Sequence, residues 1–70
     1  MIRPSDLKRV GGGSIHVYTS TTGHRMNWSA ISQQVHGSTP AGEFGFAGEA
    51  ESAVEAKRVY CDWFNRGERD

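Results

Sequence analysis

The chain has 70 residues, and its eight Lys and Arg side chains balance eight Asp and Glu side chains, which gives a formal charge of zero. This length predicts one small domain over residues 1–70, which buries only about 60% of the surface that the unfolded chain exposes. Zero net charge argues against a dedicated nucleic-acid binder, because such proteins usually depend on a basic surplus. We expect a marginal domain that gains stability from dimerisation or from a partner.

Cysteine and histidine usage argues against a cofactor. A single cysteine, Cys61, cannot form a disulfide within the chain, and the three histidines show no zinc-ligand spacing with it. We therefore expect no metal and no cofactor. A lone cysteine fits a reducing compartment, the start of the sequence shows no apolar signal region, and no apolar run could span a membrane. These features predict a cytoplasmic protein.

Residues 1–13 are predicted to form an N-terminal tail that ends in a glycine-rich hinge. Residues 1–10 leave two alternatives open. Ser5 could begin a short helical turn, or the segment could run extended and dock its apolar side chains one by one. The three glycines that follow disfavour any regular element, so we expect a hinge or a turn before the first strand.

Residues 14–32 predict an antiparallel hairpin. In its first strand, Ile15 and Val17 share one face, and His16 and Tyr18 share the other. A turn over residues 19–24 leads into the second strand. In that strand Met26, Trp28 and Ala30 share one face, which we expect to face the core.

The next two segments predict a loop and a third strand. Residues 33–42 are polar and contain glycine and proline, so we expect a loop, in which residues 33–35 could prolong the second strand. Residues 43–47 read as a short strand with Phe44 and Phe46 on one face. Gly45 between them indicates a bulge or a close backbone neighbour.

Residues 49–66 predict a C-terminal amphipathic helix, because their apolar side chains gather on one half of a helical projection. The expected fold class is therefore α+β, in which a three-stranded antiparallel sheet over residues 14–47 packs on one helix (β-β-β-α). The predicted core contains ten residues: Ile15, Val17, Met26, Trp28, Phe44, Phe46, Ala53, Ala56, Tyr60 and Phe64.

One helix can cover only one face of such a sheet, so we expect an open face that binds a partner. The loop over residues 33–42 and the flank of the helix are the other candidate surfaces. The predicted partner-binding residues come from all three: His16, Tyr18, Arg25, Asn27, Ile31, His36, Val59 and Trp63.

The sequence offers no Ser/His/Asp or Cys/His arrangement, so we expect a protein that is not an enzyme. We predict a small regulator or inhibitor that binds the surface of another protein, either as a homodimer or with a different partner. Short chains of this kind include phage and mobile-element products that block host machinery by occupying a surface. Only the small size of the chain favours that interpretation, and no particular residue supports it.

Nucleic-acid binding by the open face is the alternative. Aromatic and basic side chains on an open sheet can stack and neutralise a single strand, and the residues predicted for this role are Lys8, Arg9, Tyr18 and Arg25. The sequence FGFAGEA at residues 44–50 also resembles the outline of the arm-type DNA-binding domains of phage integrases, in which a phenylalanine strand leads into an alanine-rich helix. Those domains read DNA with basic strands, whereas Arg25 is the only basic residue in the strands predicted here.

Overall fold

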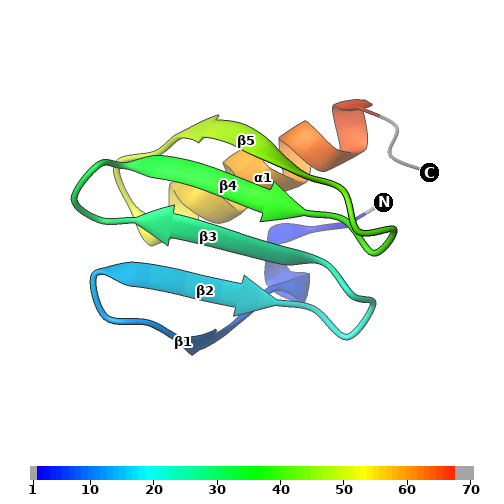
Figure 1. Cartoon of the computed structure of the whole chain (residues 1–70), viewed down its shortest axis with the longest axis horizontal. Coiled ribbons are helices and arrows are strands. Elements are labelled where there is room, and N and C mark those ends of the chain that lie inside the picture. Colours follow the sequence, from blue (N-terminus) through cyan, green and yellow to red (C-terminus); the bar gives the residue numbers. More distant parts are fainter. Residues whose placement is uncertain (1, 68–70) are drawn as a thin grey trace.

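The computed structural model describes residues 2–67, in which a five-stranded antiparallel sheet packs on one C-terminal helix (Figure 1). Strands that follow one another in the chain are neighbours in the sheet, so the order is β1-β2-β3-β4-β5. The helix lies behind β3, β4 and β5. The elements are η1 (Pro4–Asp6), β1 (Lys8–Gly11), β2 (Ile15–Thr19), β3 (Arg25–Ser29), β4 (Gln34–Ser38), β5 (Phe44–Glu49) and α1 (Ala53–Gly67).

The α+β class agrees with the prediction, but the prediction of three strands is wrong. One additional strand, β1, comes from the segment predicted as tail and hinge, and it pairs Lys8 with Thr19. The glycines after it form the tight turn into β2, and the Arg9 guanidinium donates to the carbonyl of Gly12 across that turn at 3.0 Å. The glycine run is therefore a connection between two paired strands, not a hinge beside the sheet.

The second additional strand, β4, comes from the segment predicted as a loop. Its buried positions are Val35 and Gly37, the alternation continues to Thr39 just after the strand, and only Val35 is strongly apolar. At Gly37 a Cβ would overlap the ring of Tyr60, so the glycine gives α1 room to approach the sheet. Because the Tyr60 ring of the helix supplies the apolar contact over Gly37, β4 needs few apolar side chains of its own.

The predicted facing of β2 is inverted. Tyr18 is 5% exposed and lies opposite Met26 on the side of the helix, whereas Ile15 is 50% exposed. His16 packs edge-on against the ring of Trp28, with 4.9 Å between the ring centroids. The larger rings of His16 and Tyr18 thus line the helix side, and strand alternation turns Ile15 and Val17 outward.

The facing of β5 is inverted as well. Phe44 is 67% exposed and Phe46 is 52% exposed, although both were predicted in the core. Gly45 faces the helix instead, and a Cβ there would lie 3.3 Å from the Trp63 ring. The bulky tryptophan fills the space under β5, so the strand presents its smallest residue inward and its two phenylalanines outward.

Four predicted core residues are buried, namely Met26, Trp28, Ala56 and Tyr60, while Ala53 and Phe64 are partly buried against them. The Trp28 indole N–H donates to the carbonyl of Ala50 at 2.9 Å and so anchors the segment before the helix. The N-terminal segment belongs to the core too. Ile2 and Leu7 are buried, and the Asn65 side chain hydrogen-bonds both backbone groups of Ile2 at 2.9 and 3.1 Å.

The helix begins at Ala53, four residues later than predicted, because Glu49 still pairs with Gln34 in the sheet. Ser52 caps the helix by accepting a hydrogen bond from the backbone N–H of Glu55 at 3.2 Å. The Ser-x-x-Glu spacing is the sequence signature of a helix start. Among residues 2–67, no helix is long and apolar enough to cross a membrane.

Candidate binding face

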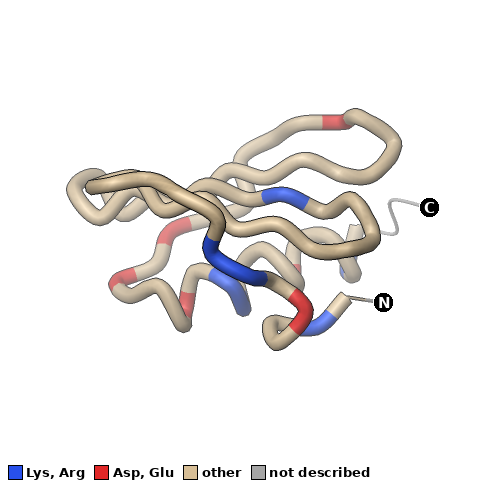
Figure 2. The backbone as a smooth tube through the Cα atoms, turned by 90° about the horizontal axis from the view of Figure 1, so that it is seen from below, with Lys and Arg blue, Asp and Glu red and all other residues tan. Residues whose placement is uncertain are grey.

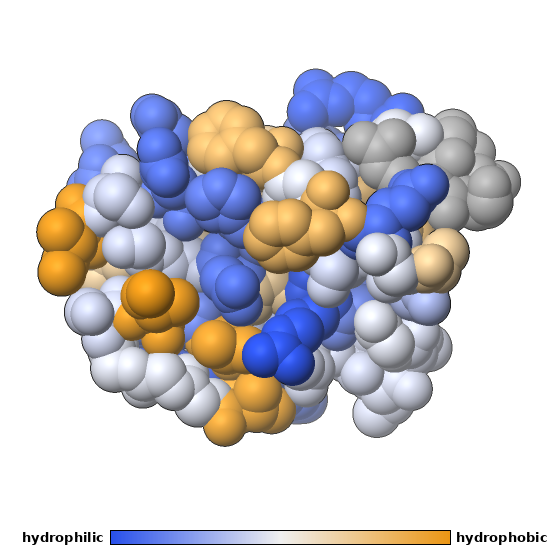
Figure 3. All heavy atoms as spheres, in the orientation of Figure 1, coloured by the Kyte–Doolittle hydropathy of each residue, from blue (hydrophilic) through white to orange (hydrophobic). Residues whose placement is uncertain are grey.

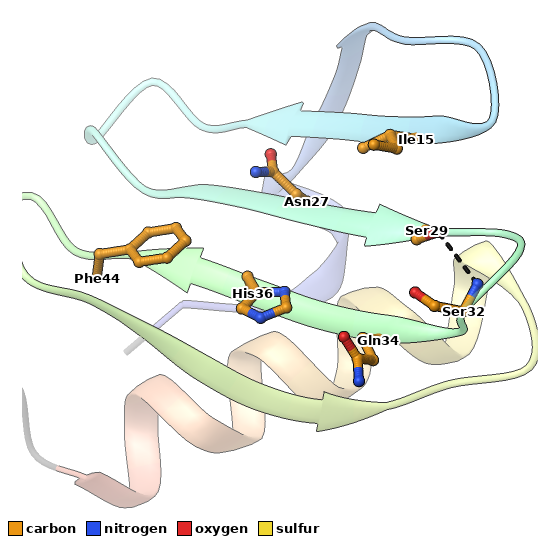
Figure 4. A pocket seen from close by; sticks show the side chains of 7 residues that line it. All are labelled: Ile15, Asn27, Ser29, Ser32, Gln34, His36 and Phe44. Carbon is orange, nitrogen blue, oxygen red and sulfur yellow. Dashed lines mark hydrogen bonds between the residues drawn. The ribbon is translucent and has the colours of Figure 1, made fainter.

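The face of the sheet turned away from α1 is called the open face. Strand alternation and register place on it the side chains that do not pack against the helix (Figure 4). From β2 to β5 these residues are Ile15, Val17, Thr19, Arg25, Asn27, Ser29, Gln34, His36, Ser38, Phe44, Phe46 and Glu49.

Two adjoining hollows mark the middle of the open face. The larger has a volume of about 390 Å³, which lies in the range of small-molecule and side-chain pockets, and the smaller has about 110 Å³. Both are lined by Asn27, His36 and Phe44. The larger hollow extends from these three residues toward the opposite end of the sheet and is called the groove. Its other lining residues are Ile15, Ser29, Ser32 and Gln34 (Figure 4).

Three aromatic rings stand beside the groove. The His36 ring stacks on Phe44 with 5.9 Å between centroids and 6° between planes, and it meets Phe46 edge-on at 5.4 Å. All three side chains come from the β4–β5 hairpin. Seen from the open face, hydrophobic side chains lie interspersed with hydrophilic ones (Figure 3). The face is therefore amphipathic, and its exposed rings are held by one another.

Asn27 occupies the centre of the open face, between Val17 and His36 in the register. Its side-chain oxygen Oδ1 is buried and has no hydrogen-bond partner among the described residues. In Figure 4 this oxygen points toward β2, and the amide nitrogen points to the side of Phe44. Buried polar atoms without partners are uncommon in folded proteins, and one in a hollow on an exposed face draws attention to that hollow.

The charges of the molecule are scattered. Acidic and basic residues are interspersed along the backbone, so neither sign of charge forms a patch of its own (Figure 2). Arg25 lines the smaller hollow, whereas the seven residues that line the groove are all uncharged or histidine. The groove therefore suits a neutral ligand.

The titratable groups with clearly shifted pKa values lie on the helix side. Burial lowers the pKa of His24, whose ring packs edge-on against Phe64 at 4.6 Å. Burial raises the pKa of Tyr60 to about 12 and that of Cys61 to about 11. None of the three lines either hollow, so their shifts describe the core rather than the candidate site.

Of the predicted partner-binding residues, the structure brings Arg25, Asn27 and His36 together on the open face. His16 and Tyr18 lie instead on the helix side, where His16 Nδ1 is 3.2 Å from the Tyr18 hydroxyl. The others are elsewhere: Ile31 is exposed in the turn between β3 and β4, and Val59 and Trp63 pack under β5.

The residues predicted for nucleic-acid binding are also divided between two faces. Lys8 and Arg25 flank Thr19 on the open side of the sheet. Arg9 lies opposite Tyr18 in the register, and Tyr18 is buried on the helix side of the sheet. The predicted pair of a stacking tyrosine and a neighbouring arginine is therefore not formed.

The sequence prediction missed the role of Phe44, Phe46 and most groove residues. It placed both phenylalanines in the core and treated residues 33–42 as a loop. A signal was present at Gly45: a bulge or a close backbone neighbour was expected there, and the structure places the Trp63 side chain against it instead. A glycine that faces a tryptophan requires the two flanking phenylalanines to face the other way.

Among residues 2–67, no three His, Cys, Asp or Glu side chains gather closely enough to hold a metal ion. The chain matches no protein-family model, no curated protein and no solved structure.

Proposed function

We propose that this chain is a small, non-catalytic binding module that acts by occupying the surface of a partner protein with its open face. The observation that carries the proposal is the pair of exposed phenylalanines, Phe44 and Phe46, whose rings both contact His36 and of which Phe44 lines two hollows. Aromatic anchors beside a pocket are typical of the residues that dominate protein–protein binding energy.

The chemistry of the hollows supports binding rather than catalysis. The groove offers amides, hydroxyls and one imidazole, and the Ser29 hydroxyl accepts a hydrogen bond from the backbone of Ser32 at 3.2 Å. A regulator or inhibitor that covers a partner's surface needs complementary shape and polarity, and it needs no activated nucleophile.

Affinity capture with matched variants tests the proposal. The double variant F44S/F46S removes both rings from the open face, and V54S is the control because Val54 on the helix has a similar exposed fraction of 61%. Each protein is immobilised and exposed to nuclease-treated extract of the organism that encodes the chain. A protein captured by this route is then purified and its affinity for each variant is measured directly.

We expect a protein that binds the wild type and V54S but binds F44S/F46S at least tenfold more weakly. All three proteins should melt within a few degrees of one another, because the substituted side chains are exposed. Equal affinity for all three proteins would place the binding surface elsewhere and refute the role of the open face.

Single-stranded nucleic acid is a second candidate ligand, because Phe44 and Phe46 share the open face with Arg25. Exposed rings beside a basic residue are how sheets stack unpaired bases. This candidate predicts binding of oligonucleotides that weakens steeply with salt and is lost in F44S/F46S. The equal numbers of acidic and basic residues make it the weaker of the two.

A further inference from the structure

Over residues 2–67 the sheet ends in two edge strands, β1 and β5, and the two differ in how well their sequences resist pairing with another strand (Figure 1). Natural sheets protect their edges with charged side chains, prolines and bulges. β1 carries Lys8 and Arg9, and its pairing with β2 is irregular between Arg9 and Gly11. Two copies of β1 side by side would bring like charges together, so this edge is protected.

The edge at β5 lacks this protection over its first residues. The stretch from Phe44 to Gly48 contains no charged side chain and no proline. Its pairing with β4 is regular from Phe44 to Phe46, and the irregularity comes after Phe46, where Ala47 has no partner in the register. Residues 44–46 therefore form a regular, uncharged stretch of sheet edge.

The backbone groups that face outward at this edge belong to the two phenylalanines. The N–H of Thr39 donates to the carbonyl of Glu43 at 2.8 Å, so these residues are bonded across the β4–β5 hairpin. Bonded and non-bonded positions alternate along an antiparallel pair of strands. Gly45 therefore bonds to β4, whereas Phe44 and Phe46 turn their N–H and C=O groups away from β4, where an added strand could bind them.

The sequence at this edge is symmetric about Gly45, because Phe44-Gly45-Phe46 reads the same in both directions. A second copy of β5, running antiparallel around a twofold axis at Gly45, places its Phe46 opposite Phe44 and its Gly45 opposite Gly45. In this register each phenylalanine both donates and accepts a backbone hydrogen bond. A second copy thus supplies a ring opposite each ring and a bond for each outward backbone group.

The side chains on both faces are compatible with this register. On the open face, the largely exposed rings of Phe44 and Phe46 form cross-strand aromatic pairs with those of the second copy and lose exposed apolar area. On the helix face, Gly45 places no side chain at the axis, and the partly buried Val59 and Trp63 pack under β5. No charged side chain of residues 44–48 is covered, because this stretch has none.

We propose that β5 is a dimerisation edge, at which two copies of the chain pair antiparallel around Gly45 and form one continuous sheet. The interface is small, so the dimer is reversible, with a dissociation constant of about 100 µM or tighter. The inference does not depend on the proposed function. Both open faces lie on the same side of the continuous sheet, so the dimer leaves their hollows accessible.

Sedimentation velocity of the wild type at loading concentrations from about 5 to about 500 µM measures the association. We expect mainly monomer at the lowest concentration and mainly dimer at the highest. A chain that remains monomeric at the highest concentration would overturn the proposal.

Charge exchange at the two opposed positions tests the edge and the register together. F44K and F46E each place a charge against a phenylalanine in their own homodimers, so each variant alone should be monomeric at concentrations at which the wild type is a dimer. In an equal mixture the introduced lysine and glutamate lie opposite each other, so a heterodimer should form. Dimers that persist in F44K and F46E alone, or a mixture that stays monomeric, would refute this register.

V10K is the matched control, because it adds the same charge at an exposed position on the other edge strand, β1. It should dimerise like the wild type. Loss of the dimer in V10K but not in F44K would assign the interface to β1 and overturn the proposal. Far-ultraviolet circular dichroism should show the same fold for all variants, because the substituted side chains are exposed.

Amide hydrogen exchange of the wild type tests the register without any substitution. The N–H groups of Phe44 and Phe46 face solvent in the monomer and are bonded in the dimer. They should therefore exchange at least twofold more slowly at about 500 µM than at about 20 µM. The N–H of Gly45, which is bonded to β4 in both states, should change less. Exchange of Phe44 and Phe46 that does not depend on concentration would overturn the proposal.

Failure of this proposal and failure of the proposed function give different results. A monomeric chain that still captures a protein through Phe44 and Phe46 would refute the dimer and leave the role of the open face intact. A dimer with the expected register that captures no protein would support the edge and count against the open face.

Discussion

The ring of Tyr60 lies against the backbone of Gly37, in the space that the Cβ of any other residue would occupy. The Tyr60 hydroxyl also donates to the carbonyl of Ser38, at 2.6 Å. Ring contact and hydrogen bond together fix the helix to β4. Because β4 carries His36 on its other face, the packing of Tyr60 also positions the centre of the candidate site.

The first prediction is that G37A destabilises the protein by about 1–3 kcal/mol, since the new methyl group forces the Tyr60 ring or the strand to move. For a domain of this size the melting temperature should fall by about 4–8 °C per kcal/mol. G11A is the matched control, because a Cβ on Gly11 meets nothing within 4 Å. Equal melting temperatures for the two variants would show that the helix accommodates the methyl group.

The second prediction concerns the hydrogen bond from Trp28 to the carbonyl of Ala50. W28F keeps a ring in the core but leaves that carbonyl unsatisfied, which should cost about 1–3 kcal/mol. W28A also opens a cavity and should cost about 3–5 kcal/mol, enough to unfold much of so small a domain. Urea titration of both variants measures the two contributions. A W28F protein as stable as wild type would mean that water replaces the bond.

The third prediction is that stability falls on mild acidification because of His24. Burial lowers the pKa of His24 in the folded state below its ordinary value of 6.5, while nearby Asp6 opposes part of the shift. As pH falls through 6.5, the unfolded chain takes up a proton before the folded chain does. The free energy of unfolding therefore decreases from pH 6.5 down to the folded-state pKa. The slope should be smaller in H24Q, and an identical slope would assign the effect to other groups.

The fourth prediction is that Cys61 reacts slowly with thiol reagents in the folded protein. The residue is buried, and burial raises its pKa to about 11, so little thiolate is present at neutral pH. The control is the double variant V54C/C61S, which moves the thiol to an exposed helix position. Ellman's reagent should label the control at least tenfold faster. Equal rates would indicate that the end of the helix opens readily.

The fifth prediction is that the protein loses stability at alkaline pH, because the pKa values of Cys61 and Tyr60 are raised in the folded state. Their folded-state pKa values, about 11 and about 12, lie above the ordinary values of 9.0 and 10.0. Between pH 9 and 12 the unfolded chain loses these protons first, so the free energy of unfolding decreases as pH rises. Thermal melts across this range in wild type and C61S measure the part due to the thiol, and an unchanged profile in C61S would exclude it.

The sequence by itself determined the helix and the β2–β3 hairpin. A helix of 15 residues shows its period over several turns, and the alternation of Met26 and Trp28 predicts their burial correctly. The α+β class follows from these elements. Arg25 and Asn27 were also expected on the face that one helix leaves uncovered, whereas His36 was expected in a loop over residues 33–42.

The tertiary structure alone decided the number of strands and the facing of β2 and β5. Strand β4 has a weak apolar pattern because Tyr60 supplies the apolar contact over Gly37, and that contact joins residues far apart in the chain. Either face of β5 could be buried on pattern alone, and the bulk of Trp63 under Gly45 turns Phe44 and Phe46 outward. The candidate site exists for this reason: the helix fills one side of the sheet with its own rings and leaves the strand's phenylalanines on the other.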